Sequence, residues 1–398
     1  MFDETLLDSP DQLTRADPRG LLRAVAAAGA QVRTAARAAQ ESDLSRIDPD
    51  GRPGALLLAG PGPDVPLIAD LLRALTGDGL PVRVLRPAGA LAAPGALTWP
   101  LPRWVGPLDL LLVTSAEGTE PGLSLLLEAA FRRGCQVVTV APADSPLAET
   151  SAHRRNLTLP LVTAPYAEPA DHPAAPGPTW AVITPLLLLG ERLGLFPPGT
   201  ADVAALQAMA DRLDAVAERC GPASRTHGNT AKTLAVEFGA ALPLLWSEGP
   251  VAHAAARHAA ATLTCLPGRP ALTAELPEAL TAHAALLNGS LVPGAGPEDF
   301  FRDRVEEPQP LRARVLLLRS PLPPGSDGPT PSAATAARDL AFSQGVAFSE
   351  LETEEPEEAG EPETPPAERG GPLLIAAELL AQLDFAAVYL TLASADRS

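Results

Sequence analysis

The chain has 398 residues, of which 46% are hydrophobic and 4% aromatic, and its formal net charge is −18. This length allows two domains with separate cores, and the negative charge argues against a nucleic-acid partner. The three cysteines, Cys135, Cys220 and Cys265, form no metal motif and favour a reducing, cytoplasmic compartment. The acidic first residues show no signal peptide, and apolar runs such as 182–190 are too short to span a bilayer, so we expect no membrane association.

The first half of the chain alternates between β-type and helical patterns after an N-terminal helical segment, residues 1–50. In that segment, apolar residues recur at helical spacing from about residue 11 to 44. Strands are expected at 55–59, 81–85, 108–113, 136–140 and 157–162, with helices at 66–75 and 121–133. This alternation predicts a doubly wound parallel-sheet domain over residues 51–165, followed by a Pro-rich linker at 166–178.

The second half alternates in the same way and predicts a second domain over residues 179–398. Helices are expected at 180–193, 203–220, 229–239, 251–263, 275–286, 333–344 and 373–392, and strands at 242–246 and 315–318. Residues 350–371 are rich in Glu, Pro and Thr, which predicts a disordered acidic loop. The predicted fold class is therefore α/β, with two doubly wound, flavodoxin-like parallel sheets.

The most specific pattern lies at residues 108–140, where a β-run, a small polar turn, a helix and a second β-run form a βαβ unit. The string Glu275-Leu276-Pro277-Glu278-Ala279 and a final apolar helix accompany it. This order of elements resembles the tandem sugar-isomerase-domain (SIS) proteins, specifically the bifunctional glucose-6-phosphate/mannose-6-phosphate isomerases. The resemblance implies a homodimer, no metal or other cofactor, a hexose phosphate or related ligand, and aldose–ketose isomerisation through an enediol.

The resemblance further implies that two Gly-containing turns bind the sugar phosphate. In the first turn, Gly60 and Gly62 leave the backbone free to turn tightly, but Asp64 stands about where the family has a serine. Lys232, the only lysine of the chain, is another candidate contact for the phosphate. The alternative is a solvated lysine that follows a helix-capping Asn229.

In the second turn, Ser115 and Gly118 match the family pattern and Thr119 stands one place early, but Glu117 and Glu120 replace a serine and a threonine. A carboxylate about 4 Å from a phosphate costs on the order of 4 kcal/mol per charge pair at an effective dielectric near 20. A charge-assisted hydrogen bond returns only about 1.5–3 kcal/mol. We therefore expect this turn to reject phosphate.

The proton-transfer residues also depart from the family pattern. The family's base Glu falls near Cys265, where this chain has no carboxylate. His283 is a candidate for the ring-opening acid, displaced by about half a helical turn, and Glu275 or Glu278 is a candidate for the base. The alternatives are a partly exposed helix histidine and a pair of glutamates at a helix N-terminus.

Two functions remain open at this stage. One is a hexose-6-phosphate isomerase with an altered catalytic set. The other is a non-catalytic SIS-domain dimer that acts as a sugar-metabolite sensor or an interaction scaffold. The acidic turn and the missing base favour the second. A metal site is not expected, because His253 and His258 stand five residues apart on different faces of their predicted helix.

Overall fold

The structure of the protein is a computed structural model. It describes residues 2–42, 44, 51–89, 94–154, 156–162, 178–288, 291, 311–320, 332–351, 353 and 371–394. Nearly all of the predicted linker lies outside these residues. The chain divides into two compact units, each described by itself below. The five-stranded unit consists of Ala26–Ala215 and Pro356–Ala377, and the four-stranded unit of Met1–Val25, Val216–Glu355 and Glu378–Ser398.

The five-stranded unit contains a fully parallel sheet in the order β2-β1-β3-β4-β5. Its strands are β1 (Leu56–Ala59), β2 (Val82–Val84), β3 (Leu110–Thr114), β4 (Gln136–Ala141) and β5 (Leu157–Pro160). This is the flavodoxin-like order, so the predicted doubly wound fold is confirmed for this sheet. Because both faces of such a sheet are covered by helices, β1 and β3 are continuous runs of buried apolar residues.

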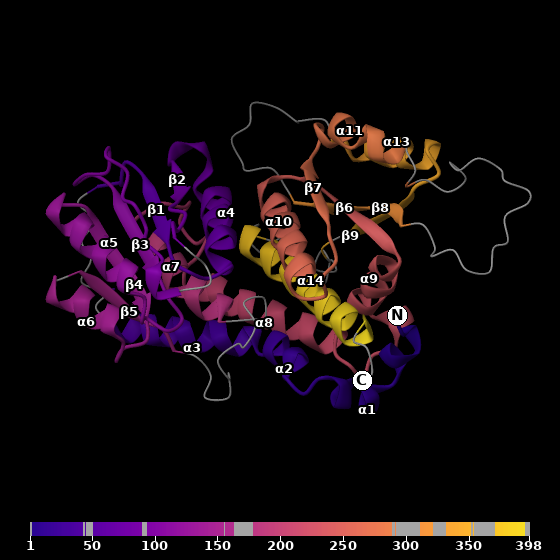
Figure 1. Ribbon diagram of the computed structural model, residues 1–398, viewed down its shortest axis with the longest axis horizontal. Helices are drawn as coiled ribbons and strands as arrows, with labels where there is room; N and C mark the ends of the chain where they lie inside the picture. Colours follow the sequence, from indigo (N-terminus) through magenta and orange to yellow (C-terminus); the bar gives the residue numbers. More distant parts are fainter. Residues whose placement is uncertain are drawn as a thin grey trace, which may run out of the picture. The chain divides into compact units, whose positions relative to one another are not determined.

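Helices cover both faces of the five-stranded sheet. They are α3 (Ala28–Glu41), α4 (Asp64–Thr76), η3 (Gly77–Gly79), η4 (Pro94–Ala96), α5 (Pro121–Arg132), α6 (Pro146–His153) and α7 (Thr179–Arg192). Figure 1 shows α5 and α6 on one side of the sheet and α4 on the other. On the α5 side, alternate residues of the strands, such as Leu57, Leu111 and Val137, pack against Leu123 and Leu127 of α5.

The four-stranded unit repeats the pattern in the order β7-β6-β8-β9, again fully parallel. Its strands are β6 (Ala241–Glu248), β7 (Leu272–Glu275), β8 (Arg312–Arg319) and β9 (Ala347–Leu351). Its helices are η1 (Glu4–Asp8), α1 (Pro10–Ala16), η5 (Thr226–Gly228), α9 (Thr230–Gly239), α10 (Pro250–Cys265), α11 (Ala279–Ala282), α12 (Ala284–Leu287) and α13 (Ala334–Ser343). Figure 1 shows α11 and α13 on one side of this sheet and α9 and α10 on the other.

Three helices have residues in both units: α2 (Leu21–Ala26), α8 (Val203–Arg219) and α14 (Pro372–Ser394). Of the described helices, α14 is long and apolar enough to cross a membrane, which the sequence analysis overlooked. However, 89% of its most apolar window is buried inside the protein. It also carries the buried polar residues Glu378 and Gln382. We therefore assign α14 as a core helix.

The structure corrects several predicted elements. The helix expected over residues 11–44 is divided into α1, α2 and α3, and α6, β7 and β9 were not predicted. The helix expected over residues 275–286 is wrong, because Glu275 is the last residue of β7 and two short helices follow it. Pro277 explains the error, since the residue before a proline avoids helical backbone angles. The first two residues of the predicted acidic loop, Glu350 and Leu351, belong to β9, and most of that loop lies outside the described residues.

Candidate functional site

Each sheet has a point where the direction of its strand order reverses, next to the first strand in the sequence, β1 or β6. Open parallel sheets bind ligands at this point, beyond the carboxyl ends of the strands. In the five-stranded unit this point lies between β1 and β3. Both predicted phosphate turns are found there, and Gly60 of the first lies against Thr114, the residue directly before the second. A side-chain Cβ on Gly60 would collide with the carbonyl and hydroxyl oxygens of Thr114, so only glycine allows this approach.

The turn after β3 is organised around Ser115. The Ser115 hydroxyl accepts hydrogen bonds from the N–H groups of Gly118 (2.6 Å) and Glu117 (3.2 Å). It donates its proton to Glu120 Oε2 at 2.7 Å. The side chain is only 3% exposed. Because a hydroxyl has a single proton, Ser115 cannot donate to a phosphate oxygen while this bond to Glu120 exists.

Glu120 thus provides, from within the chain, the anionic acceptor that a phosphate would otherwise provide. It directly precedes α5, where the helix N-terminus favours a negative charge. Gly118 adopts a φ of 68°, and a Cβ there would collide with the Ser145 hydroxyl, so the turn requires glycine at this position. Thr119 is exposed, with its hydroxyl 3.4 Å from Glu117 Oε2.

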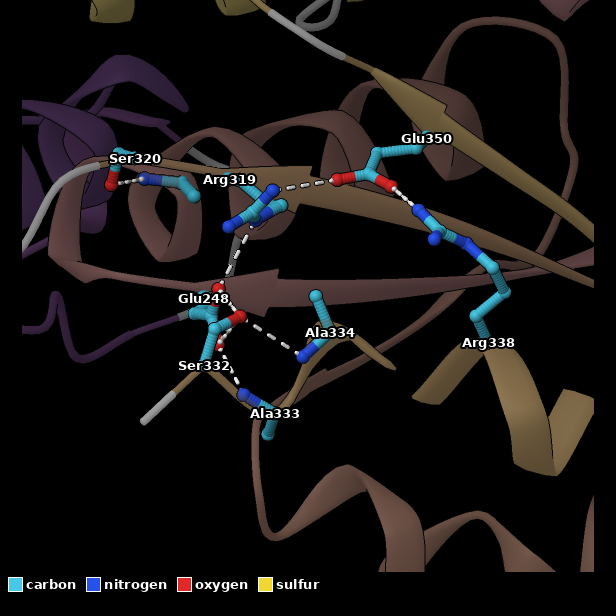
Figure 2. A network of polar contacts seen from close by, with 9 residues as sticks. Glu248, Arg319, Ser320, Ser332, Ala333, Ala334, Arg338 and Glu350 are labelled. Atoms are coloured by element: carbon cyan, nitrogen blue, oxygen red, sulfur yellow. Dashed lines mark hydrogen bonds and ion pairs between the residues drawn. The ribbon is translucent and has the colours of Figure 1, made fainter. Parts of the chain in front are cut away.

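The carboxyl edge of the four-stranded sheet carries a chain of alternating charges, Glu248, Arg319, Glu350 and Arg338, which we call the edge network (Figure 2). Arg319 donates from Nε to Glu248 Oε2 and from Nη1 to Glu350 Oε1, both at 3.1 Å. Arg338 donates to the other oxygen of Glu350 at 2.6 Å. The positive charges at this edge are therefore already paired with carboxylates of the chain.

Glu248, at the end of β6, makes further bonds to the start of α13. It accepts the Ser332 hydroxyl at 2.8 Å and the Ala333 N–H at 2.7 Å. Burial acts to raise the pKa of Glu248, but these bonds and the one from Arg319 outweigh it and leave the pKa lowered. Glu248 is therefore an anion whose hydrogen-bonding partners all come from its own unit.

The predicted acid His283 is buried, with 7% exposure. Its Nδ1 lies 2.9 Å from Nε1 of Trp246 on β6. Because the indole N–H can only donate, Nδ1 must be the acceptor, which leaves the proton of the neutral ring on Nε2. Burial lowers the pKa of His283. The alternative of a partly exposed helix histidine is wrong, because the residue is buried between α11 and α12, while its role as an acid stays a prediction.

The two predicted base candidates do not share a helix face. Glu275 ends β7 and is 55% exposed, and Glu278 is an exposed residue directly before α11. His253 Nδ1 lies 3.5 Å from Glu275 Oε1, an ion-pair distance without hydrogen-bond geometry. The interpretation as a charge pair on one helix is therefore incorrect, while a role of either carboxylate as a base stays a prediction.

Lys232 is fully buried rather than solvated, although Asn229 caps its helix as predicted. Its ammonium group donates to the carbonyl oxygens of Leu7 (2.6 Å), Pro222 (2.9 Å) and Ser224 (2.7 Å). Burial lowers the pKa of Lys232. An ammonium group has three protons, so these bonds leave Lys232 no donor for a ligand. This placement argues against the predicted phosphate contact and makes Lys232 a structural residue.

The edge network was not predicted from the sequence. The strands that carry Glu248 and Arg319 were predicted to end at residues 246 and 318, and Glu350 was placed in a loop. The available signal was a charged residue at the end of each apolar β-run, because parallel strands bring their carboxyl ends to one edge. Among the described residues, no group of three or more His, Cys, Asp or Glu is arranged to hold a metal ion.

No protein-family model and no curated protein sequence matches the chain. Solved structures match it over most of its length. A candidate phosphosugar isomerase from Clostridium difficile 630 superposes with a TM-score of 0.59 at 10% identity, covering 93% of this chain and 92% of that one. A candidate sugar-binding protein from Salmonella typhimurium LT2 gives 0.53 at 13% identity, covering 93% and 98%.

The C-terminal domain of glucosamine-fructose-6-phosphate aminotransferase from Francisella tularensis also matches, with a TM-score of 0.50 at 10% identity, covering 94% of this chain and 96% of that one. At these identities the likeness establishes the fold. The chain has the architecture of tandem SIS domains, as the sequence resemblance implied.

Lys232 yields a prediction about stability. In Lys232→Met, one buried and two partly buried carbonyl groups lose their donor, and each unsatisfied buried group costs about 1–3 kcal/mol. We expect the free energy of unfolding in urea to fall by about 3 kcal/mol or more. Arg15→Met, which removes an exposed positive charge from α1 of the same unit, should change it by less than about 0.5 kcal/mol. Equal effects of the two substitutions would contradict the structural role.

His283 yields a prediction about pH. Because its pKa is lowered on folding, the unfolded chain binds the extra proton first, and stability declines as the pH falls below about 6.5. His283→Gln keeps an acceptor for Trp246 and should reduce this slope, by up to about 1.4 kcal/mol per pH unit. Urea titrations between about pH 7 and pH 5 measure the slope, with His153→Gln, a change of the exposed last residue of α6, as the control. An unchanged slope in His283→Gln would disprove the assignment.

Proposed function

We propose that this protein is a non-catalytic, carbohydrate-derivative-binding protein built on the tandem SIS fold. The observation that carries the proposal is the bond between Ser115 and Glu120. At the strand reversal, where this fold offers a hydroxyl and backbone amides to an anion, the chain supplies its own carboxylate instead. The protein thereby keeps the scaffold without a phosphate subsite at this turn.

The other candidate groups support the absence of isomerase chemistry. Moving a proton between the two carbons of a hydroxy-carbonyl unit requires a base within hydrogen-bond reach of substrate and an acid able to give up its proton. Among the residues that the structure describes, neither Glu275 nor Glu278, both exposed, has a hydrogen-bonding partner that would position it as a base. His283 is buried, uncharged, and fixed through Nδ1 to Trp246.

The binding part of the proposal is supported by the likeness to the candidate sugar-binding protein from Salmonella typhimurium. We further propose a homodimer in the cytoplasm, on the resemblance to the SIS isomerases and on the cysteine content. The alternative function, an active hexose-6-phosphate isomerase, is supported by the fold likeness to candidate phosphosugar isomerases.

The acidic turn provides the test of this proposal. Glu117→Ser combined with Glu120→Thr removes two negative charges and frees the Ser115 hydroxyl. We expect calorimetric affinity for glucose 6-phosphate to rise at least about tenfold, equivalent to about 1.4 kcal/mol. Neither the wild type nor this variant should convert glucose 6-phosphate to fructose 6-phosphate.

A matched control removes the same charge elsewhere in the five-stranded unit. Glu41→Ser combined with Glu128→Thr changes α3 and α5 away from the turn and should leave the affinity unchanged within about twofold. Turnover by the wild type at about 1 s⁻¹ or faster would establish the isomerase instead. Equal affinities of the two double variants would show that the turn does not exclude phosphate.

A further inference from the structure

The five-stranded unit carries two exposed aromatic rings that face arginines. Trp104 is 50% exposed and Phe131 is 51% exposed. The guanidinium group of Arg83, on β2, lies 5.9 Å from the centre of the Trp104 ring. That of Arg154, directly after α6, lies 5.0 Å from the centre of the Phe131 ring. Because aromatic and arginine side chains contribute most of the binding energy at protein interfaces, these pairs are suited to binding a partner.

The two aromatic–arginine pairs lie at one junction of the unit. Arg133, the residue directly after α5, donates hydrogen bonds to the carbonyl oxygens of Leu101 and Pro102. A Cβ on Gly134 would lie 3.4 Å from the Pro107 ring. The loop that contains the tryptophan therefore lies against the C-terminal end of α5, which contains the phenylalanine. The arginine surface, as we call it, consists of Arg83, Arg103, Trp104, Phe131, Arg132 and Arg154.

The arginine surface is positive, whereas the whole chain has a net charge of −18. Among the described residues, its four arginines form ion pairs with a single carboxylate, that of Glu128 on α5. Glu128 lies 3.9 Å from Arg132 and 3.7 Å from Arg154. One carboxylate cannot balance four guanidinium groups, in contrast to the edge network, where carboxylates and arginines alternate. The arginine surface therefore attracts an acidic partner.

The sequence contains a segment of complementary chemistry. Residues 354–368, the acidic segment, contain seven glutamates, four prolines and no basic residue, and they lie outside the described residues. Carboxylates pair with guanidinium groups, and aromatic surfaces bind proline-rich segments. Shortly after the acidic segment α14 begins, and its first residues, 372–377, belong to the five-stranded unit. Fifteen extended residues span up to about 50 Å, which exceeds the roughly 30 Å width of a small domain.

The covalent link favours this segment over a separate acidic partner. A separate partner would approach a chain of net charge −18 and be repelled by it. A segment of the same chain is held near the surface at a high effective concentration. We propose that the acidic segment docks on the arginine surface of its own chain, with its glutamates paired to the arginines and its prolines against Trp104 and Phe131.

Trp104 can report this docking in the full-length protein. The other three tryptophans, Trp99, Trp180 and Trp246, are at most 8% exposed, so the neutral quencher acrylamide reaches mainly Trp104. Changing all seven glutamates of the acidic segment to glutamine should raise the Stern–Volmer constant at least about twofold, because the segment no longer covers the ring. Raising NaCl from about 0.1 M to about 1 M should have the same effect on the wild type. Both differences should disappear when Trp104→Phe is added.

Substitution of arginines tests where the segment docks. Arg132→Gln combined with Arg154→Gln leaves Trp104 unchanged and should raise acrylamide quenching by at least about 1.5-fold. Arg37→Gln combined with Arg192→Gln removes the same charge from exposed positions on α3 and α7 and should leave quenching unchanged within about 10%. Circular dichroism verifies that each variant is folded.

Three outcomes would overturn the inference. Equal quenching of the wild type and the glutamine variant would exclude docking, and equal quenching of the two double-arginine variants would exclude this location. Shielding of Trp104 that is lost on about hundredfold dilution would assign the contact to a second copy instead of the same chain. None of these results depends on sugar or phosphate binding, so the proposed function is tested separately.

Discussion

The hydrogen bond between the Ser115 hydroxyl and the Glu120 carboxylate determines how the strand reversal of the five-stranded sheet can be used. A parallel sheet brings the ends of its strands, with their free backbone amides and following helix N-termini, to one edge. In this chain, side chains of the turn itself bond the groups that a ligand would use at that edge. The Ser115 hydroxyl oxygen accepts hydrogen bonds from two N–H groups of the turn, and the hydroxyl donates a hydrogen bond to Glu120. The turn is thereby complete without a ligand.

The four-stranded sheet reaches a similar result by different chemistry. Its carboxyl edge holds two arginines, which an anion would otherwise use, but Glu248 and Glu350 neutralise them in the edge network (Figure 2). Lys232 is likewise committed to three backbone carbonyls. In each unit, the groups suited to binding a phosphate are engaged by the chain itself. This common feature is the main structural support for the proposed non-catalytic role.

Much of the fold could be predicted from the sequence. The buried runs of β1, β3 and β8 are apolar and short, and parallel strands covered on both faces require that pattern. Two strands were missed. β7 has no buried residue, and β9 is only partly buried and carries Ser349 and Glu350, so both lack that signal. The helix predicted through Pro277 failed because helical spacing was given more weight than the backbone restriction before a proline.

The candidate site was predictable only in part, for a related reason. That Glu117 and Glu120 oppose phosphate followed from charge alone, but that Glu120 bonds Ser115 depends on how the turn folds. Lys232 shows the same limit, because its partners Leu7 and Ser224 are distant or irregular segments whose carbonyl positions no local pattern specifies. His283 could be recognised as a titratable group, whereas its bond to Trp246 required the packing of β6 against the segment between α11 and α12.

A crystal structure of the wild-type protein grown in excess glucose 6-phosphate tests the central claim most directly. The account predicts that the Ser115 hydroxyl remains bonded to Glu120, with no phosphate density at the turn after β3. A phosphate group bound to Ser115 and the Gly118 N–H, with the Glu120 side chain displaced, would contradict it.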